Sequence, residues 1–332
     1  MTAPLPMAAP ALNWGILGAG GIAHKFADAV NTYTAGRIAA VASASGVDRA
    51  QAFVAETGHG TPYGSYQELL DDPAVDAVYV ATTHNNHHTP ALAAIAAGKA
   101  VLVEKAFAQN GAQVALMVEA ARARGTFLME AMWTRHLPHV YAIREAIARG
   151  EIGEVVSVQA DHGQQLTHVP RLMQPELAGG ALLDLGVYPI AFAHDILGAP
   201  TSVTAVGQLT STGVDAHIGM VLSYPNAQAS LTTTLLAATG NRAVIAGTEG
   251  RIEVEETFYA PTRFRVIRND GTEWSFDGRV PNGFQYQAAE VARQVAAGHK
   301  ESPVLPLASS VEIMGIMDDV RAQVGVVYPN ER

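Results

Sequence analysis

The chain of 332 residues is too long for one ordinary hydrophobic core, so its length predicts two domains. Acidic residues outnumber basic ones by 31 to 21, which argues against nucleic acid or an anionic membrane as a partner. There is no cysteine, and this excludes disulfides, cysteine metal sites and thiol nucleophiles.

The first ten residues are rich in Ala and Pro and carry no basic residue. They are unlike a signal peptide, and we expect a flexible or extended arm over residues 1–10. No apolar run approaches the length of a membrane span. The expected location is therefore the cytoplasm.

Strand-like and helical stretches alternate between residues 11 and 131. The expected strands are 13–17, 37–43, 62–63, 77–81, 100–104 and 126–131, and the expected helices are 21–35, 48–56, 65–70, 89–98 and 110–124. Such alternation predicts a parallel sheet that is covered on both faces, with ligands at the carboxyl ends of its strands.

The pattern changes after about residue 131. Helices are expected at 138–149, 186–197, 284–298 and 307–323, and strands at 154–161, 203–209, 217–224, 228–234, 242–246, 251–255 and 264–268. Their short connections favour antiparallel pairing. We therefore expect an α/β protein: a dinucleotide-binding domain over 11–131, and an α+β domain with a largely antiparallel open sheet over 132–332.

A glycine-rich turn follows the first expected strand. Gly18, Gly20 and Ala23 have the spacing G-x-G-x-x-A, in which the first glycine permits a tight turn, the second admits a pyrophosphate and the alanine lets helix and strand pack closely. Gly21 and Ile22 begin the helix and offer N–H groups to phosphate. A bound dinucleotide is the favoured interpretation, and a plain glycine turn is the alternative.

The end of the second strand bears on the choice of cofactor. NAD enzymes usually carry an acid there, but residues 38–47 contain none, and Asp48 is accounted for by a capping box with Gln51. Ser43, Ser45 and Arg49 could bind a 2′-phosphate. The sequence therefore favours NADP, with NAD as the alternative.

Two places carry residues suited to catalysis. Glu104 and Lys105 directly follow an apolar strand, although Lys105 could also be an ordinary surface lysine. Asp184 and Tyr188 are four residues apart among apolar neighbours and share a face if the segment is helical. A tyrosine can exchange protons if a cation such as Lys105 lowers its pKa from about 10. The alternatives are a core tyrosine and a helix cap.

The histidines at positions 84, 87 and 88 suggest a metal site at first sight. No cysteine or nearby carboxylate completes such a site. We therefore expect no metal there.

Three segments resemble the Gfo/Idh/MocA oxidoreductases. They are the glycine turn, the stretch from Ala81 to Lys105 with its Ala97-Gly98-Lys99 and Glu104-Lys105, and Gly179-Gly180 through Asp184 to Tyr188. The segment Glu130-Ala-Met-Trp-Thr-Arg135 resembles the branch that contains dimeric dihydrodiol dehydrogenases and glucose–fructose oxidoreductase. Ala106 departs from the usual Glu-Lys-Pro, but the change removes no reacting group.

The resemblance implies hydride transfer between nicotinamide and the carbinol or carbonyl carbon of a sugar, polyol or cyclic diol. Tyr188 would exchange the proton, Lys105 would lower its pKa, and Asp184 would bind a neighbouring hydroxyl or hold the lysine; in some relatives the lysine transfers the proton. Further residues are expected at the cofactor (Thr82, His84, His87 and Glu104) and at the substrate (Trp133, Arg135 and His162).

The resemblance also implies a homodimer or homotetramer formed through the C-terminal sheet. Three other functions stay open: a sugar–sugar oxidoreductase with a tightly bound, recycled cofactor, a non-catalytic dinucleotide-binding sensor, and a methyltransferase.

Overall fold

The computed structural model describes residues 3–331, which form two compact units. The N-terminal unit comprises Pro4–Trp133 and Asn282–Val311, and the C-terminal unit comprises mainly Thr134–Pro281 and 312–331. The sequence suggested two continuous domains, 11–131 and 132–332. The division found here differs, because residues 282–311 pack within the N-terminal unit. Positions 1, 2 and 332 of the expected domains lie outside the described residues.

The N-terminal unit is built on a six-stranded sheet in which all neighbouring strands are parallel. Its strand order is β3-β2-β1-β4-β5-β6. The strands are β1 (Asn13–Leu17), β2 (Arg37–Ala42), β3 (Thr61–Tyr63), β4 (Ala77–Val80), β5 (Ala100–Val103) and β6 (Leu128–Glu130). The order reverses between β1 and β4, which is the point where open α/β sheets bind ligands. The expected dinucleotide-binding fold is confirmed.

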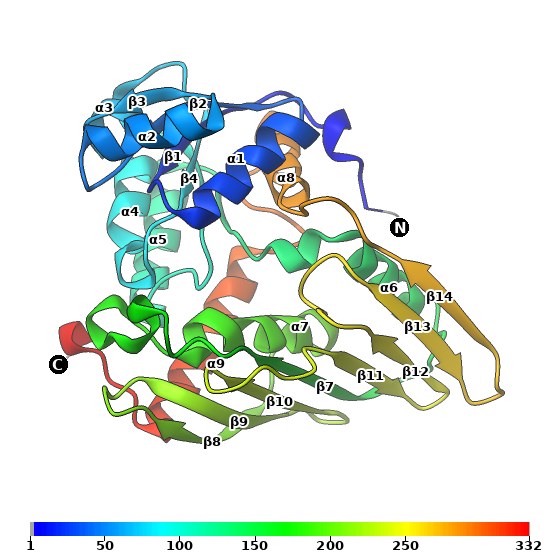
Figure 1. The fold of residues 1–332 in the computed structure, drawn as a ribbon. Helices are drawn as coiled ribbons and strands as arrows, with labels where there is room; N and C mark the ends of the chain where they lie inside the picture. Colours follow the sequence, from blue (N-terminus) through cyan, green and yellow to red (C-terminus); the bar gives the residue numbers. More distant parts are fainter. Residues whose placement is uncertain (1–2, 332) are drawn as a thin grey trace. The chain divides into compact units, whose positions relative to one another are not determined.

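Helices cover this sheet in two groups. Contacts join α1, α2 and α8 in one group and α3, α4 and α5 in the other (Figure 1). Their bounds are α1 (Gly21–Tyr33), α2 (Val47–Thr57), α3 (Tyr66–Asp71), α4 (His88–Ala96), α5 (Gly111–Arg124) and α8 (Gln285–Ala296). Because both faces are covered, β4 and β5 are buried along their whole length.

Helix α2 begins differently from the expectation. Its N-cap is Gly46, at a φ of 102°, and no side chain caps the helix. The capping box expected for Asp48 and Gln51 is therefore wrong. The turn from Ser43 to Gly46 closes through a 3.1 Å backbone hydrogen bond and starts the helix earlier, so Asp48 lies in its first turn, where an acid favours the helix dipole.

The start of the chain also differs from the flexible arm expected over residues 1–10. Pro6–Ala8 form a short 3-10 helix that contacts α8, and Pro6 and Ala9 are buried. Proline favours this turn because its φ is fixed near the helical value. Residues 1 and 2 of the expected arm lie outside the described part of the chain.

The C-terminal unit contains an eight-stranded sheet in the order β14-β13-β12-β11-β7-β10-β9-β8. Every neighbouring pair is antiparallel except β7 and β10. The strands are β7 (Val155–Gly163), β8 (Ser202–Leu209), β9 (Asp215–Ser223), β10 (Gln228–Thr234), β11 (Ala243–Gly247), β12 (Gly250–Val254), β13 (Arg263–Arg268) and β14 (Glu273–Asp277). The largely antiparallel sheet is therefore confirmed. Burial alternates along β9 and β10, so one face packs on the core and the other faces outward.

Helix α7 (Val187–Leu197) packs on β7 and β10, and α6 (Pro138–Ala148) packs on β14 (Figure 1). Helix α9 (Leu307–Val324) runs from one unit into the other along the chain. The segment Pro175–Leu197 is long and apolar enough for a membrane span by composition, but 94% of its most apolar window is buried inside the fold. That burial is typical of a core segment.

A π-helical turn, Leu182–Gly186, precedes α7. The sequence suggested an α-helix from residue 186, so the π turn is new. Pro189 follows this turn within a continuous helical run, so its missing N–H leaves the carbonyl oxygen of Leu185, four residues earlier, without that helical donor, and the His162 Nδ1 lies 3.1 Å from this oxygen instead. Such π turns occur often at functional sites, and this one contains Asp184.

Candidate active site

The glycine turn of the N-terminal unit has the geometry that its residue types suggest. Gly18 has a φ of 107°, and a Cβ placed on it would lie 2.5 Å from the carbonyl oxygen of Ala81 at the end of β4. Only glycine therefore fits there. Ala23 is fully buried, which lets α1 pack closely on the sheet.

Gly20 and Gly21 present open backbone. A Cβ on either would meet no atom within 4 Å, and Gly20 caps α1 without any side-chain hydrogen bond. Ile22 follows in the first turn, where backbone N–H groups have no partner within the helix. An open, uncapped helix start of this kind fits the pyrophosphate of a dinucleotide.

Arg49 approaches this turn from α2. Its Nε donates a hydrogen bond of 3.1 Å to the carbonyl oxygen of Ala19. The Ser43 hydroxyl accepts the N–H of Ser45 at 3.2 Å, so it shapes its own turn, while the Ser45 side chain is exposed. Arg49 and Ser45 therefore lie on the same edge of the unit as the glycine turn.

The loop after β4 contains three expected cofactor residues. The Thr82 hydroxyl donates to the carbonyl oxygen of Asn86 at 2.7 Å. The His87 ring lies 2.8 Å from the carbonyl oxygen of Ala106 and 3.2 Å from that of Thr82, and it links the loops after β4 and β5. Its burial lowers the pKa of His87 to about 4, so the ring is neutral at pH 7. His84 is also buried, with its ring edge-on to His87.

Within residues 3–331, no three His, Asp or Glu side chains gather in an arrangement that could hold a metal ion. The contacts of His87 with two backbone carbonyl oxygens indicate that this histidine has a structural role in the loops after β4 and β5.

Glu104 and Lys105 follow β5 at the carboxyl edge of the sheet. The buried Glu104 carboxylate accepts hydrogen bonds from the Tyr79 hydroxyl and, at 3.2 Å, from the N–H of Lys105. Lys105 is half-buried, and its peptide bond to Ala106 is cis. Glu104 therefore shapes the backbone at Lys105.

Trp133 stacks on Phe284 within the N-terminal unit, with ring centroids 4.6 Å apart. Phe284 directly precedes α8 and was not among the expected site residues. The stacking partner comes from a segment about 150 residues later, so no local pattern indicates it.

Asp184 and Tyr188 lie in the C-terminal unit, Asp184 in the π turn and Tyr188 at the start of α7. Both residues are largely buried, at 7% and 8% exposed. Both terminal nitrogens of Arg171 donate to one carboxylate oxygen of Asp184, at 3.2 and 3.1 Å. Asp184 is therefore an ion-paired acid, and Arg171 is a partner that the sequence did not suggest.

Tyr188 is surrounded by aromatic rings. His162 lies 5.3 Å from it and Tyr259 lies 4.7 Å from it, between ring centroids, and these two rings stack on each other at 4.0 Å. The Gln164 amide donates to the Tyr259 hydroxyl at 3.0 Å and bonds the His162 Nε2 at 2.9 Å.

The contact of His162 Nδ1 shows which group donates in the hydrogen bond between His162 Nε2 and the Gln164 amide. Nδ1 lies 3.1 Å from the carbonyl oxygen of Leu185, which can only accept, so Nδ1 carries the proton and Nε2 accepts from Gln164. His162 thus presents a neutral, fixed ring beside Tyr188.

Comparison with known families covers both units. Residues 12–132 match the oxidoreductase family with an NAD-binding Rossmann fold, and residues 140–253 match the GFO/IDH/MocA C-terminal domain. The chain belongs to the Gfo/Idh/MocA oxidoreductase family.

Several curated proteins resemble this Gfo/Idh/MocA oxidoreductase over nearly its whole length. Trans-1,2-dihydrobenzene-1,2-diol dehydrogenase of Mus musculus is 38% identical, over 97% of this chain and 99% of the relative. The enzyme of the same name from Danio rerio is 40% identical, with the same coverage. Among solved structures, the 3-ketoreductase KijD10 of Actinomadura kijaniata, in complex with NADP and TDP-benzene, is 28% identical. It has a TM-score of 0.85 and covers 95% of this chain and 98% of its own.

The chain is thus an NAD(P)-binding oxidoreductase, a dehydrogenase or reductase that acts on CH–OH groups. Of the expected site residues, Lys105 and Trp133 belong to the N-terminal unit. Asp184, Tyr188 and His162 belong to the C-terminal unit of this Gfo/Idh/MocA protein.

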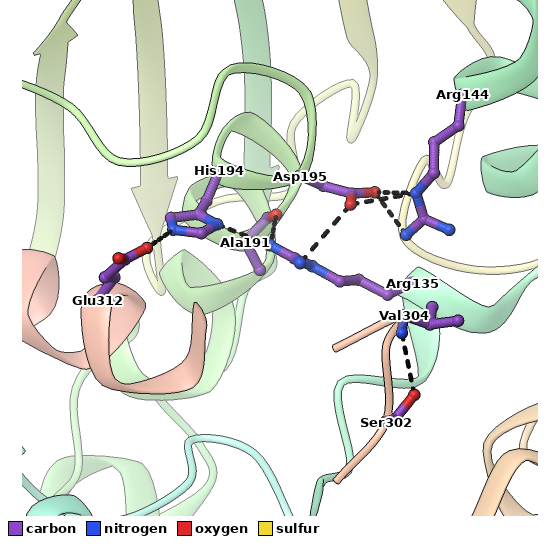
Figure 2. A network of polar contacts seen from close by, with 8 residues as sticks. All are labelled: Arg135, Arg144, Ala191, His194, Asp195, Ser302, Val304 and Glu312. Atoms are coloured by element: carbon purple, nitrogen blue, oxygen red, sulfur yellow. Dashed lines mark hydrogen bonds and ion pairs between the residues drawn. The ribbon is translucent and has the colours of Figure 1, made fainter. Parts of the chain in front are cut away.

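Arg135 was expected at the substrate, but its contacts indicate a different role. Its guanidinium faces α7, where Nη2 donates to the Ala191 carbonyl oxygen at 3.3 Å and to the His194 Nδ1 at 2.9 Å (Figure 2). Asp195 lies 3.6 Å from Nη1. These contacts favour a structural role for Arg135 over the expected substrate contact.

The same network extends on both sides of Arg135. Because His194 Nδ1 accepts from Arg135, its Nε2 carries the proton and donates to Glu312 at 2.7 Å. On the other side, Arg144 pairs with Asp195 at 2.7 Å (Figure 2). The network thus ties α6, α9 and the segment before α6 to α7, which begins with Tyr188.

Proposed function

We propose that the protein is an NADP-preferring dehydrogenase or reductase of a sugar, polyol or cyclic diol, with Tyr188 and Lys105 as its acid/base pair. The observation that carries this proposal is the setting of Tyr188. Its hydroxyl-bearing ring stands at the start of a helix, beside a fixed neutral histidine and close in sequence to the ion-paired Asp184.

The glycine turn at Gly18–Gly21 would hold a nicotinamide dinucleotide, which would supply hydride transfer to or from the carbinol carbon. Tyr188 would take the hydroxyl proton during oxidation and give it back during reduction. Lys105, as a cation, would lower the pKa of the Tyr188 hydroxyl and hold the substrate oxygen. Asp184, oriented by Arg171, would accept a hydrogen bond from a neighbouring substrate hydroxyl.

NADP is proposed over NAD because of the residues at the end of β2. Ser45 and Arg49 offer a hydroxyl and a guanidinium there, and Asp48 is exposed in the first turn of α2. Arginine suits a 2′-phosphate because its planar fork binds phosphate in two places. The NADP in KijD10 is consistent with this choice.

The substrate class follows from two lines of support. The related dehydrogenases act on trans-1,2-dihydrobenzene-1,2-diol, a cyclic diol, and KijD10 is a 3-ketoreductase. Around Tyr188, the rings of His162 and Tyr259 would contact carbon faces, while Gln164 and Asp184 would recognise hydroxyls. A ring that carries adjacent hydroxyl groups fits this mixture.

The test is a panel of sugars, polyols and cyclic diols, assayed in both directions with NAD and NADP. We expect reduced nicotinamide to form with at least one vicinal diol and NADP to give the higher kcat/KM. No turnover with any member of the panel would contradict the proposal. A reduced nicotinamide signal in the freshly purified protein would favour the recycling sugar–sugar oxidoreductase instead.

We also propose that the outward face of the C-terminal sheet forms a homodimer. On this face Val206 is 73% exposed, and the strands near the middle carry small neutral side chains such as Ser230 and Thr232. Ser230 lies opposite Gln159 on β7, in the centre of the sheet. Ser230→Arg should therefore convert a dimer to a monomer in analytical ultracentrifugation, and an unchanged mass would contradict this interface.

A further inference from the structure

The segment with Asp184 and Tyr188 begins at a turn of two glycines, Gly179 and Gly180. Gly180 has a φ of 116°, and a Cβ built on it would lie 2.1 Å from Oδ1 of Asp215. A Cβ on Gly179 would lie 2.5 Å from the carbonyl oxygen of Leu172. Both glycines are therefore required by close packing, and at Gly180 the space is taken by a carboxylate.

Asp215 is the first residue of β9 and is completely buried. Its Oδ2 accepts the N–H of Leu182, the first residue of the π turn, at 2.6 Å. Burial raises the pKa of Asp215 to about 6, while its hydrogen bond from Leu182 acts in the opposite direction. A fully buried carboxylate is costly, and here it is placed where helical N–H groups have no partner of their own.

Tyr328 holds the same turn from the other end of the chain. Its hydroxyl donates to the carbonyl oxygen of Gly179 at 2.8 Å, and its ring is completely buried. The Arg321 guanidinium lies 4.9 Å from the centre of this ring and pairs with Glu331 at 2.8 Å, so these contacts hold Tyr328 in place. The carbonyl of Gly179 in the turn and the N–H of Leu182 after it are thus bound by two separate side chains.

We infer that Asp215 and Tyr328 are positioning residues, which hold the Gly179–Gly180 turn and thereby fix the places of Asp184 and Tyr188. This inference rests on the proposed function for its effect on catalysis, because neither residue is assigned a contact with substrate or cofactor. Asp184 lies four positions and Tyr188 eight positions after Gly180, and every residue from 181 to 188 is helical. A shift of the turn would therefore move both side chains together.

The first test compares Asp215→Ala, Asp215→Asn and Tyr328→Phe with the wild-type chain. We expect Asp215→Ala to lower kcat about tenfold to a hundredfold, as small displacements of reacting groups do. Tyr328→Phe should lower kcat roughly threefold to tenfold, the effect of one hydrogen bond. Asp215→Asn keeps an acceptor for the N–H of Leu182 and should restore most of the loss. The cofactor Kd should stay unchanged in all three variants.

Tyr224→Phe is the matched control. The Tyr224 hydroxyl is buried and has no hydrogen-bond partner among the described residues, so its loss should leave kcat unchanged. Each variant is assayed well below its own Tm. A lower Tm with unchanged kcat in Asp215→Ala and Tyr328→Phe would overturn the positioning role.

Hydrogen–deuterium exchange provides a readout that does not depend on activity. The amides of residues 181–188 should exchange faster in Asp215→Ala and Tyr328→Phe, while those of β12 should not change. Unchanged exchange over 181–188 would overturn the inference whatever the kinetics show. If the wild-type chain turns over no substrate, the proposed function fails, and exchange alone decides whether the two residues hold the turn.

Discussion

Arg171 places both terminal nitrogens on a single carboxylate oxygen of Asp184. The pair is asymmetric, because the arginine side chain is 46% exposed whereas that of the aspartate is 10% exposed. A largely exposed cation adds little stability. We therefore infer that the main effect of this ion pair is to orient the Asp184 carboxylate.

Replacing Arg171 tests that orientation. We expect Arg171→Met to raise KM for a polyhydroxylated substrate by about tenfold, while the free energy of unfolding changes by about 1 kcal/mol or less. Steady-state kinetics and urea denaturation measure the two effects. Arg242→Met, at an exposed arginine of the same unit, is the control. Equal KM values for the two variants would show that Arg171 does not serve Asp184.

The Tyr188 hydroxyl is the proposed proton carrier. Tyr188→Phe should reduce kcat by about 10² to 10⁴, the usual contribution of a general acid or base, and should leave the Kd for NADP near the wild-type value. Stopped-flow kinetics and cofactor fluorescence measure these quantities. Retained turnover would assign the proton transfer to another group, with Lys105 the first candidate.

Tyr259 and Gln164 are the neighbours of Tyr188 that sequence reasoning missed. Tyr259→Phe removes the acceptor for the Gln164 amide but keeps the ring that stacks on His162. We expect kcat/KM to fall roughly threefold to tenfold for sugars and polyols, because their hydroxyl groups depend on hydrogen bonds. For an unsaturated cyclic diol the fall should be smaller, because its ring carbons also pack against the aromatic side chains. An equal loss for both substrate classes would rule out a role of this hydroxyl in selection.

Arg135 should matter for stability rather than for substrate binding. Its side chain is largely buried, and removing the guanidinium leaves the buried His194 Nδ1 and the Ala191 carbonyl oxygen without this donor, and leaves Asp195 with Arg144 as its cation. Arg135→Met should therefore lower the free energy of unfolding by about 3 kcal/mol and leave KM unchanged. A raised KM with normal stability would support the substrate contact that the sequence suggested.

His139 predicts a dependence of stability on pH. Burial lowers its pKa from 6.5 to about 4, and its Nε2 bonds the carbonyl oxygen of Phe258 at 3.0 Å. The unfolded chain takes up a proton on this ring as the pH falls through 6.5, whereas the folded protein does so only near pH 4. Its contribution to the free energy of unfolding should thus fall by up to about 3 kcal/mol between these pH values.

The variant His139→Gln isolates this effect, because glutamine can keep the bond to Phe258 but does not titrate. The free energy of unfolding of the variant should vary less between pH 6.5 and 4.5 than that of the wild type. His87 and Asp215 titrate in both proteins, so their contributions cancel in the comparison. Parallel pH curves would contradict the lowered pKa of His139.

Much of the fold could be predicted because its signals are local. Gly18 and Ala23 fulfil roles that their residue types and spacing dictate, and alternation of strands and helices gave the parallel sheet. Asp184 and Tyr188 could be chosen as candidates because polar groups within a short apolar segment are unusual, and their catalytic roles stay a prediction.

The missed features depend on distant partners. Thr134 donates to the carbonyl oxygen of Tyr259 from 125 positions earlier, and this bond holds the irregular loop that brings Tyr259 to Tyr188. Nothing near Tyr259 in the sequence marks it. Arg135 was assigned to the substrate for the same reason, since its partners on α7 lie 56 and 59 residues away.

The grouping of residues 282–311 with the N-terminal unit affects the order in which the chain can fold during synthesis. The N–H of Leu128 on the edge strand β6 bonds the carbonyl oxygen of Lys300, and Ser310 donates to Glu130, 180 positions earlier. At about 5–20 residues per second, a ribosome needs roughly 10–40 s to add the 180 positions that separate Glu130 from Ser310. During that time β6 is an unpaired edge strand, while β7–β14 are being synthesised. We therefore expect chaperones to bind the growing chain mainly near β6, until residues 282–311 have been synthesised and cover this strand.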